Sequence, residues 1–177
     1  RFFNICVVSH MRQVKDPMRT ALAVRDLPPY SRIMVRHLGM ADSETAASIA
    51  IKETKRNPRY TWKGEVPRWR VRQEFLRTHL MVISSKAEGG ANVISEAVIA
   101  GVPIVASNID GNIGLLGKSY GGYYPLGDTN ALREVLLKAE GNENFIAGLA
   151  GQCHALAPKF TIKHEQECWR QLIARFT

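Results

Sequence analysis

The sequence predicts an α/β fold with a doubly wound parallel sheet of about six strands. Short apolar runs alternate with segments of helical periodicity, and this alternation is typical of a parallel sheet covered by helices on both faces. The chain has 177 residues and an apolar fraction of 45%, which is enough for one such domain, or one domain plus an appendage. No internal repeat or low-complexity segment interrupts the pattern.

The expected strands are short apolar runs bounded by turn residues. They cover Asn4–Ser9, Arg32–Gly39, Tyr60–Gly64, Leu80–Ser85 and Pro103–Ser107, with room for a sixth near Gly122–Leu126. The expected helices cover Asp16–Asp26, Ser43–Arg56, Arg68–Thr78, Asn92–Ala100 and Asp128–Glu140. The tail Asn142–Phe176 reads as two more helices, broken near Pro158.

An acidic segment at residues 42–44 has two interpretations. Asp42-Ser43-Glu44 superficially resembles a metal-binding carboxylate pair, but it stands where a helix N-cap belongs, with Glu44 in the first turn. We therefore expect a cap. The histidines at positions 37, 79, 154 and 164 are isolated, so the sequence predicts no metal site.

The most informative stretch runs from Glu88 to Ala97 and reads Glu-Gly-Gly-Ala-Asn-Val-Ile-Ser-Glu-Ala. A strand leads in and a helix begins within it, so free backbone N–H groups and the helix dipole face one point, where an anion can bind. Glu88 precedes this helix and Glu96 lies inside it, on the order of 10–12 Å apart at about 1.5 Å per helical residue. This is too far for an acid and a base on one glycosidic bond, and it suits two hydroxyl clusters flanking a diphosphate. A solvated charge is the plain alternative for Glu96.

Ligands of such sheets bind in the loops at the carboxyl ends of the strands. Those loops are His10–Asp16, Met40–Asp42, Glu65–Pro67, Lys86–Ala91 and Asn108–Gly117.

Three of these loops carry further candidates. In the first, we expect at least one of His10, Arg12 and Lys15 to meet phosphate, and the others to be surface charges. Gly64, before the third, allows a flat base to approach the backbone, or marks an ordinary turn. The fifth, with Asn112, has three glycines and two asparagines, which suit a polar ligand as well as a plain connection.

The chain is basic, with a net charge of +8. The basic residues cluster at Lys52–Arg72 and, more thinly, at Lys159–Arg175. A phosphorylated ligand, an anionic membrane surface, nucleic acid or a solvated basic face would each account for them. Because the basic segments carry no nucleic-acid-binding motif, we expect no nucleic-acid partner.

The spacing of the cysteines and the hydropathy of the sequence indicate the cellular compartment that we expect. Cys6, Cys153 and Cys168 are scattered without the spacing of a metal site or a disulfide framework, which indicates a reducing environment. No apolar run approaches the roughly 18 residues of a membrane span. We expect a cytoplasmic protein, at most peripheral to a membrane. Because a strand-like run starts directly after Arg1, we also expect this sequence to be part of a longer chain.

The spacing Glu88-x7-Glu96, continued by Ala97-Val-Ile-Ala-Gly-Val-Pro-Ile-Val-Ala106, resembles the C-terminal, donor-binding domain of retaining glycosyltransferases with two Rossmann-like domains, the GT-B type. The resemblance is closest to glycosyltransferase family 4 (glycosyl transferases group 1) and covers about residues 3–140. It implies a Rossmann-like domain over residues 1–160, and a C-terminal helix over residues 161–177 that packs toward an N-terminal domain of the same chain. It also implies a nucleotide-diphosphate sugar as a substrate, with no separate cofactor and no metal.

The resemblance assigns roles to matching positions. Glu88 would contact the donor sugar, Glu96 would hold the ribose hydroxyls, and Lys15 would bind the diphosphate. Backbone amides facing the sugar and the diphosphate would come from Gly89, Gly90, Ala91, Asn92 and Val93. The turn Trp62–Val66 would contact the base, which adds Gly64, Glu65 and Val66.

The chain departs from the family pattern at three places. His10 stands where the family commonly has arginine, so Arg12 is expected to supply that charge. Glu88-Gly-Gly-Ala91 replaces Glu-Gly-Phe-Gly, which removes an aromatic side chain beside the sugar. Asp110-Gly-Asn-Ile-Gly-Leu-Leu-Gly117 replaces Gly-Gly-x-x-Glu, so the surroundings of the donor sugar are expected to differ.

Several segments resemble a narrower group, the selenosugar synthases, which use a UDP-N-acetylhexosamine and selenophosphate. These segments are Lys15-Asp-Pro17, Asn57-Pro-Arg-Tyr60, Glu88-Gly-Gly-Ala-Asn92, Gly111-Asn-Ile-Gly-Leu-Leu-Gly117 and Gly122-Tyr-Tyr-Pro-Leu-Gly-Asp128.

The expected function is therefore donor binding in a metal-independent retaining glycosyltransferase, with Glu88, Lys15 and Arg12 nearest the reaction. UDP-N-acetylglucosamine 2-epimerases share the two-domain architecture and remain an alternative from another enzyme class. A non-catalytic module that binds through the basic face is a third. The Glu88-x7-Glu96 spacing and Lys15 favour the transferase.

Overall fold

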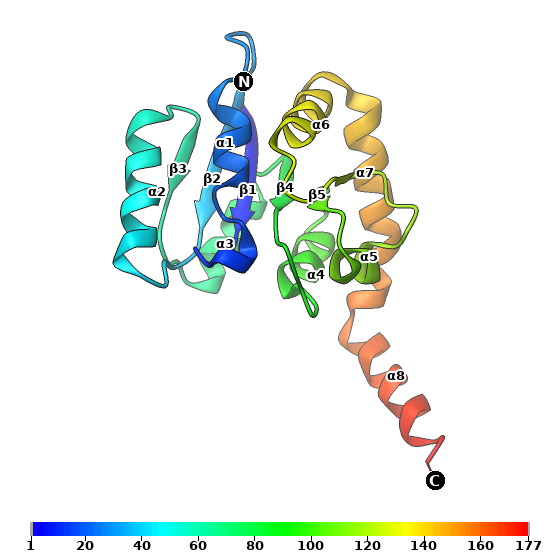
Figure 1. The fold of residues 1–177 in the computed structure, drawn as a ribbon. Helices are drawn as coiled ribbons and strands as arrows, with labels where there is room; N and C mark the ends of the chain where they lie inside the picture. The colour runs from blue at the N-terminus through cyan, green and yellow to red at the C-terminus, as the bar shows by residue number, and fades with distance from the viewer. Residues whose placement is uncertain (1, 177) are drawn as a thin grey trace.

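A six-stranded parallel sheet with the strand order β3-β2-β1-β4-β5-β6 organises the molecule (Figure 1). The computed structural model describes residues 2–176. The strands are β1 (Phe3–Val8), β2 (Ile33–Leu38), β3 (Tyr60–Trp62), β4 (Leu80–Ile83), β5 (Ile104–Ser107) and β6 (Tyr123–Tyr124). The predicted α/β class and the sixth strand are confirmed. The order reverses between β1 and β4, which is the switch point of a doubly wound sheet.

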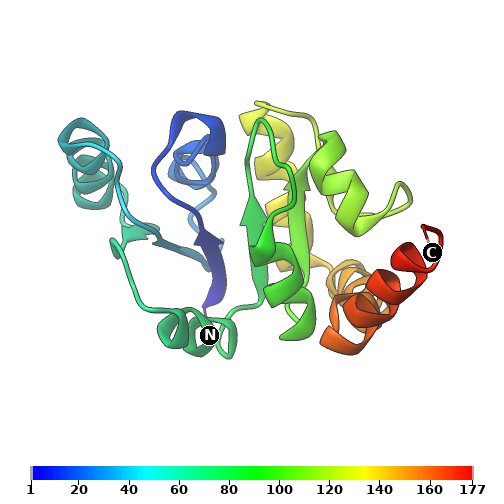
Figure 2. The same cartoon turned by 90° about the horizontal axis from the view of Figure 1, so that it is seen from below.

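Helices cover both faces of the sheet (Figure 2). The helices α1 (Arg19–Arg25), α2 (Glu44–Arg56) and α6 (Thr129–Gly141) lie on one face. The opposite face carries α3 (Arg68–Phe75), α4 (Asn92–Ile99) and α7 (Glu143–Leu156). The remaining helices are α5 (Asp110–Leu116), α8 (Ile162–Ile173) and the short 3-10 turns η1 (Gln13–Lys15) and η2 (Ala157–Phe160).

The core follows from burial on both faces of the central strands. Every residue of β4 and β5 is buried, so both strands read as continuous apolar runs instead of alternating ones. Helix residues such as Ile94, Leu132 and Leu136 are fully buried against them. Each such side chain stabilises the fold by roughly 1.5–3 kcal/mol relative to an exposed one.

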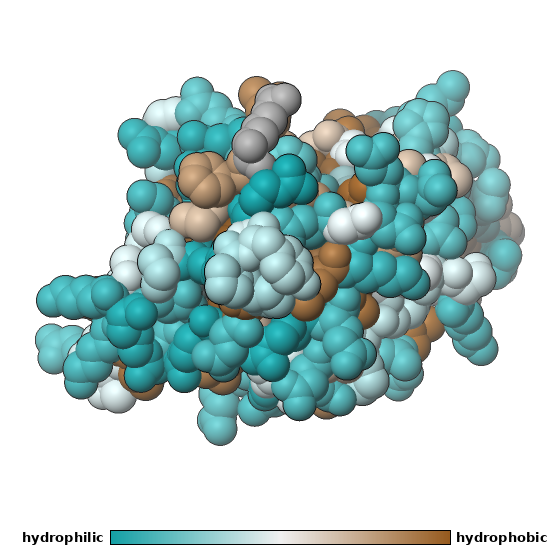
Figure 3. Space-filling view, turned by 90° about the horizontal axis from the view of Figure 1, so that it is seen from above, coloured by the Kyte–Doolittle hydropathy of each residue, from teal (hydrophilic) through white to brown (hydrophobic). Residues whose placement is uncertain are grey.

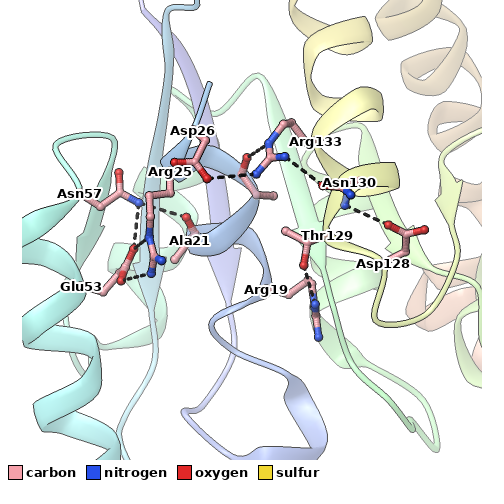
Figure 4. Close-up of polar contacts among 11 residues, drawn as sticks. Arg19, Ala21, Arg25, Asp26, Glu53, Asn57, Asp128, Thr129, Asn130 and Arg133 are labelled. Carbon is pink, nitrogen blue, oxygen red and sulfur yellow. Dashed lines mark hydrogen bonds and ion pairs between the residues drawn. The ribbon is translucent and has the colours of Figure 1, made fainter. Parts of the chain in front are cut away.

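A buried carboxylate joins α2 to the end of α1 (Figure 4). The Glu53 side chain is fully buried and accepts hydrogen bonds from Arg25 at 2.8 Å, Arg56 at 2.6 Å and Asn57 at 3.1 Å. Burial alone would raise the pKa of Glu53, but these donors outweigh it and lower the pKa. The same Asn57 amide donates to the carbonyl of Ala21, which ties α1 to the β3 side of the sheet.

A second set of contacts joins α1 to α6 across the switch point (Figure 4). Arg19 donates to the Thr129 hydroxyl at 2.6 Å, and Arg133 donates to the Ala23 carbonyl at 3.0 Å. Arg133 also lies 3.6 Å from the Asp26 carboxylate. Since β1 and β4 share only two register pairs, these side chains help hold the halves of the sheet together.

Some predicted element bounds need correction. The segment Asn108–Gly117, expected to be a loop, is mostly the helix α5. The helix expected from Asp16 begins at Arg19, because Asp16 has a left-handed φ of 44° and ends η1. The cap predicted at residues 42–44 is confirmed, since the Ser43 hydroxyl accepts from the Ala46 amide at 3.1 Å. The break near Pro158 is confirmed as η2.

The two ends of the sheet differ in character. Figure 3 shows the end where β1 begins: hydrophilic residues dominate it, and apolar residues form small separate patches. Scattered apolar residues of this kind are ordinary for a solvated surface. At the opposite end α8 projects from the body of the domain, and each of its residues is exposed (Figure 1).

Candidate functional site

A cavity of about 420 Å³ lies at the carboxyl ends of β1 and β4, at the switch point. Ligands of doubly wound sheets bind at this place because the loops of neighbouring strands diverge there. Predicted site residues form much of its wall: His10, Lys15, Glu65, Val66, Glu88, Gly90, Ala91, Asn92 and Val93. The structure thus brings together candidates from three separate loops.

Lys15 and Glu88 form an ion pair at this cavity. Lys15 Nζ lies 2.6 Å from Oε1 and 2.7 Å from Oε2 of Glu88, and the Ser85 hydroxyl donates to Oε1 at 2.6 Å. The Glu88 side chain is only 8% exposed, whereas that of Lys15 is 27% exposed. The carboxylate is therefore held by two partners, while the ammonium group retains contact with solvent.

The backbone around Lys15 is fixed by the loop after β4. The Ser84 hydroxyl donates to the carbonyls of Lys15 at 3.1 Å and Asp16 at 2.9 Å. The Lys86 amide donates to the Val14 carbonyl at 2.8 Å. With Asp16 at positive φ, the chain turns sharply after Lys15, and strain of this kind is common at functional sites.

The start of α4 offers backbone donors to an anion. Its N-cap is Ala91, which has no side chain that could accept from the first turn. The helices α1, α3 and α5 also begin without a side-chain cap, whereas side chains cap α2, α6, α7 and α8: Ser43, Asp128, Asn142 and Thr161. Because Ala91, Asn92 and Val93 line the cavity, the uncapped turn and its dipole lie at the cavity wall.

The loops after β1, β2 and β3 are locked together. The Gly39 amide donates to the Gly64 carbonyl at 2.8 Å, and Trp62 Nε1 donates to the Gly39 carbonyl at 2.9 Å. A Cβ at Gly39 would lie 1.9 Å from the Ser9 carbonyl oxygen, so only glycine allows this approach. Gly64 has a φ of +71°, which turns the chain toward Glu65 and Val66.

A buried histidine, treated as isolated in the sequence, ties these strands together. His37 Nε2 lies 3.0 Å from the Ser9 carbonyl oxygen, which can only accept, so Nε2 carries the proton. His37 Nδ1 then accepts from the Tyr60 hydroxyl at 2.8 Å. Burial lowers the pKa of His37 to about 4, so the ring is neutral at pH 7 and works as a structural link.

Several predicted site residues do not line this cavity. Glu96 and Arg12 are exposed, Gly89 lies in the exposed turn after Glu88, and Gly64 borders a shallow hollow beside Trp62. Asn112 is fully buried and donates to Ser107.

Other residues near the cavity were missed from the sequence. Ser84, Ser85 and Gly39 line the wall, and Ser85 bonds Glu88 directly. The sequence does contain a signal for these residues, since two serines directly follow the apolar run of β4 and a glycine directly follows β2. A second, more open hollow of about 410 Å³ lies between the loops after β4 and β5 and shares Glu88.

Neither a metal site nor a membrane span stands out over residues 2–176. Within that range no group of three or more histidine, cysteine, aspartate or glutamate side chains is arranged to hold a metal ion. No helix in the same range is both long and apolar enough to cross a membrane.

Family comparison identifies the chain. The model of the family "Glycosyl transferases group 1" matches residues 3–146. The chain belongs to this family. A search of curated protein sequences gives no significant match.

Solved structures resemble the whole domain. Anabaena Alr3699/HepE, solved with UDP and glucose, matches with a TM-score of 0.83 and 19% identity over 98% of this chain and 48% of its own. The pneumococcal O-GlcNAc transferase GtfA, solved with UDP and GlcNAc, matches with a TM-score of 0.76 and 17% identity, over 98% of this chain and 35% of its own. A trehalose-6-phosphate synthase matches with a TM-score of 0.78 and 16% identity, over 97% of this chain and 45% of its own.

These comparisons confirm the predicted membership of glycosyl transferases group 1 and the Rossmann-like half of a GT-B fold. The finer assignments, to glycosyltransferase family 4 and to the selenosugar synthases, stay predictions. The present chain spans about half the length of HepE. It spans a smaller share of the other two proteins.

Proposed function

We propose that this chain is the donor-binding domain of a retaining, metal-independent glycosyltransferase whose donor is a UDP-linked sugar. The observation that carries the proposal is the Lys15–Glu88 pair beside the uncapped start of α4, inside a cavity at the switch point. A cation and free amides suit a diphosphate, and a carboxylate next to them suits sugar hydroxyls. Family membership, and the UDP in the structures of HepE and GtfA, support the choice of donor.

Each part of the site has a proposed role. Lys15 and the amides of Ala91, Asn92 and Val93 hold the diphosphate, and the turn at Gly64–Val66 meets the base. Glu96 holds the ribose hydroxyls from the exposed side of α4, and Glu88 reads the sugar. Arg12 lies in the same loop as Lys15 and adds positive charge near the diphosphate, and the ring of His10 in that loop offers a polar contact.

The proposed transfer occurs on one face of the sugar. The bond between C1 and the diphosphate oxygen breaks, its electron pair leaves with UDP, and the acceptor forms the new bond to C1 from the same side. A proton on the attacking atom of the acceptor passes to the leaving diphosphate oxygen. Lys15 and the α4 amides stabilise the charge that grows on the leaving diphosphate. No side chain is assigned as a covalent nucleophile, so retention rests on front-face attack.

A second domain is part of the proposal. The helix α8 exposes Ile162, Trp169, Leu172 and Ile173, with Phe176 just beyond it. An apolar stripe on an otherwise polar helix is expected to pack against another surface. We propose that an N-terminal domain of the same protein covers α8, binds the acceptor and closes the cleft. The present chain should then bind nucleotide but transfer no sugar by itself.

The alternatives are separable by product. Family membership favours a transferase over a UDP-N-acetylglucosamine 2-epimerase and over a non-catalytic basic module. Free UDP-N-acetylmannosamine as product would identify the epimerase, and salt-sensitive binding to anionic vesicles without transfer would identify the module.

The narrower proposal, an N-acetylhexosamine donor with selenophosphate as acceptor, is tested by incubating the complete enzyme with that pair and looking for a selenium–sugar bond by mass spectrometry.

Glu96→Ala should weaken UDP binding by about tenfold or more. Two hydrogen bonds from ribose hydroxyls to a carboxylate would be lost, and bonds to a charged group are worth roughly 1.5–3 kcal/mol. Calorimetry on the purified chain measures this, with Glu134→Ala as a matched control, because Glu134 is also exposed on a helix but lies away from the cavity, on α6. Unchanged UDP affinity in a folded Glu96→Ala variant would remove the ribose role.

Excess EDTA should leave most of the activity of the complete enzyme intact. Lys15 and the α4 amides are proposed to supply the positive charge that a cation supplies in metal-dependent transferases. The measurement is initial rate of UDP release with and without EDTA. Complete loss that Mn²⁺ or Mg²⁺ restores would contradict metal independence.

A further inference from the structure

The first turn of α5 presses against the backbone of Glu88. A Cβ built on Gly111 would lie 2.1 Å from the Glu88 carbonyl oxygen and 2.9 Å from the Glu88 Cβ. No real side chain tolerates a contact of 2.1 Å, and the obstacle is backbone, which cannot swing away. Gly111 has no positive φ, so space and not backbone conformation demands glycine here. The backbone of α5 therefore lies so close to the backbone of Glu88 that only a residue without a side chain fits at position 111.

A series of hydrogen bonds also connects the first turn of α5 to the Glu88 side chain. The side-chain nitrogen of Asn112, Nδ2, donates to the Ser107 carbonyl at 2.9 Å and lies 3.1 Å from the Ser107 hydroxyl oxygen. The Ser107 hydroxyl donates to the Ser85 carbonyl at 2.6 Å. The Ser85 hydroxyl donates to Glu88 Oε1 at 2.6 Å. Ser85, Ser107 and Asn112 are all buried, at 2%, 0% and 0% exposure, so water does not compete for these bonds.

The direction of this chain of bonds is fixed. A carbonyl oxygen accepts but cannot donate, so the Ser107 carbonyl requires the nitrogen end of the Asn112 amide to face it. The other end, Asn112 Oδ1, is buried without a hydrogen-bond partner among the described residues. A buried acceptor without a partner costs stability. The role of the Asn112 side chain is therefore the hydrogen bond that its nitrogen donates to Ser107.

We propose that the first turn of α5 positions the Glu88 carboxylate, with Gly111 acting through close packing and Asn112 acting through Ser107 and Ser85. The inference rests on the proposed role of Glu88 in contacting the donor sugar. It makes Asn112 a positioning residue instead of a direct ligand. It also places control of sugar selectivity partly in the first turn of α5, whose residues hold Glu88 without touching the sugar.

The test compares two glycines of one helix. Gly111→Ala adds a methyl group against Glu88, whereas Gly114→Ala adds it in α5 where nothing lies within 4 Å. Calorimetry on the purified chain measures UDP, UDP-glucose and UDP-N-acetylglucosamine. We expect Gly111→Ala to keep UDP affinity within about twofold and to weaken at least one UDP-sugar by about tenfold, which equals about 1.4 kcal/mol. Gly114→Ala should bind all three ligands like the parent chain.

A crystal structure of Gly111→Ala gives a readout that does not depend on the ligand. We expect the bidentate contacts of 2.6 and 2.7 Å between Lys15 and Glu88 to be lost. If both contacts persist, the positioning inference is wrong, whatever Glu88 does.

Ser85→Ala is the second variant, should Gly111→Ala fail to fold. It removes only the hydroxyl that bonds Glu88, and we expect the same selective loss of UDP-sugar affinity. If Glu88→Ala lowers UDP-sugar affinity but Ser85→Ala does not, positioning of Glu88 through Asn112, Ser107 and Ser85 is excluded and the proposed function stands. If Glu88→Ala has no effect on any UDP-sugar, the proposed role of Glu88 fails instead, and the Lys15–Glu88 geometry of the variants alone decides the positioning inference.

Discussion

Lys15→Ala is expected to weaken UDP and UDP-sugar together, by about 10- to 100-fold. Lys15 is the cation of the cavity wall, and loss of charge-assisted bonds to a diphosphate corresponds to roughly 1.5–3 kcal/mol. In the complete enzyme kcat should fall by about 10²–10³, the typical cost of removing one electrostatic contact to a developing negative charge. Calorimetry with both ligands and steady-state rates measure the two effects.

Two variants control for this result. Lys118→Ala removes an exposed lysine that lines neither the cavity nor either of the two hollows, and it should change neither affinity. Lys15→Met keeps the length of the side chain without its charge, so it separates loss of charge from loss of packing. Equal UDP affinity in Lys15→Met and the parent chain would show that Lys15 does not meet the diphosphate.

Glu88→Ala, unlike Lys15→Ala, is expected to discriminate between UDP-sugar and UDP. It should weaken UDP-sugar by about tenfold or more, because hydrogen bonds from sugar hydroxyls to a carboxylate are lost. UDP affinity should be kept or should rise, since Lys15 loses the carboxylate that neutralises it and offers its full charge to phosphate. Titrations of UDP and UDP-sugar against the same preparation give the ratio directly.

Glu88→Gln is the matched control for shape. It keeps an acceptor for the Ser85 hydroxyl but removes the negative charge, so UDP should again bind at least as well as to the parent. The double variant Lys15→Ala, Glu88→Ala should show strong non-additivity, because the two side chains contact each other. If Glu88→Ala and Lys15→Ala weakened UDP equally, the division of roles between them would be wrong.

The sheet and the position of the cavity could be predicted because they depend on pattern. β4 and β5 read as apolar runs joined by a glycine-rich turn and a helix, and parallel strands place such turns at one edge. The family spacing from Glu88 to Glu96 marked the same turn. Element bounds differed by a few residues where caps decide them, as at Asp16.

What could not be predicted depends on contacts between distant segments. Lys15 and Glu88 are 73 positions apart, and no local rule pairs them. Asn112 was expected in a loop after β5, either at a polar ligand or in a plain connection. The glycines of that segment each disfavour helix by roughly 1 kcal/mol. In the fold, the close approach to Glu88 requires Gly111, and the segment becomes helical around that contact. Packing therefore overrode propensity at the place where the chain departs from its family.

The apolar stripe of α8 has a consequence for the behaviour of this chain in solution. Copies that each carry a charge of +8 repel one another at low ionic strength, where the screening length is about 30 Å at 0.01 M. At 0.15 M that length falls to about 8 Å, so the repulsion fades while attraction between exposed Trp169, Ile173 and Phe176 side chains persists. Salt is thus expected to promote self-association through α8 and, by the same screening, to weaken the proposed contact between Lys15 and phosphate. We therefore expect both the colloidal stability of the chain and its affinity for nucleotide to be highest under the same dilute-salt conditions.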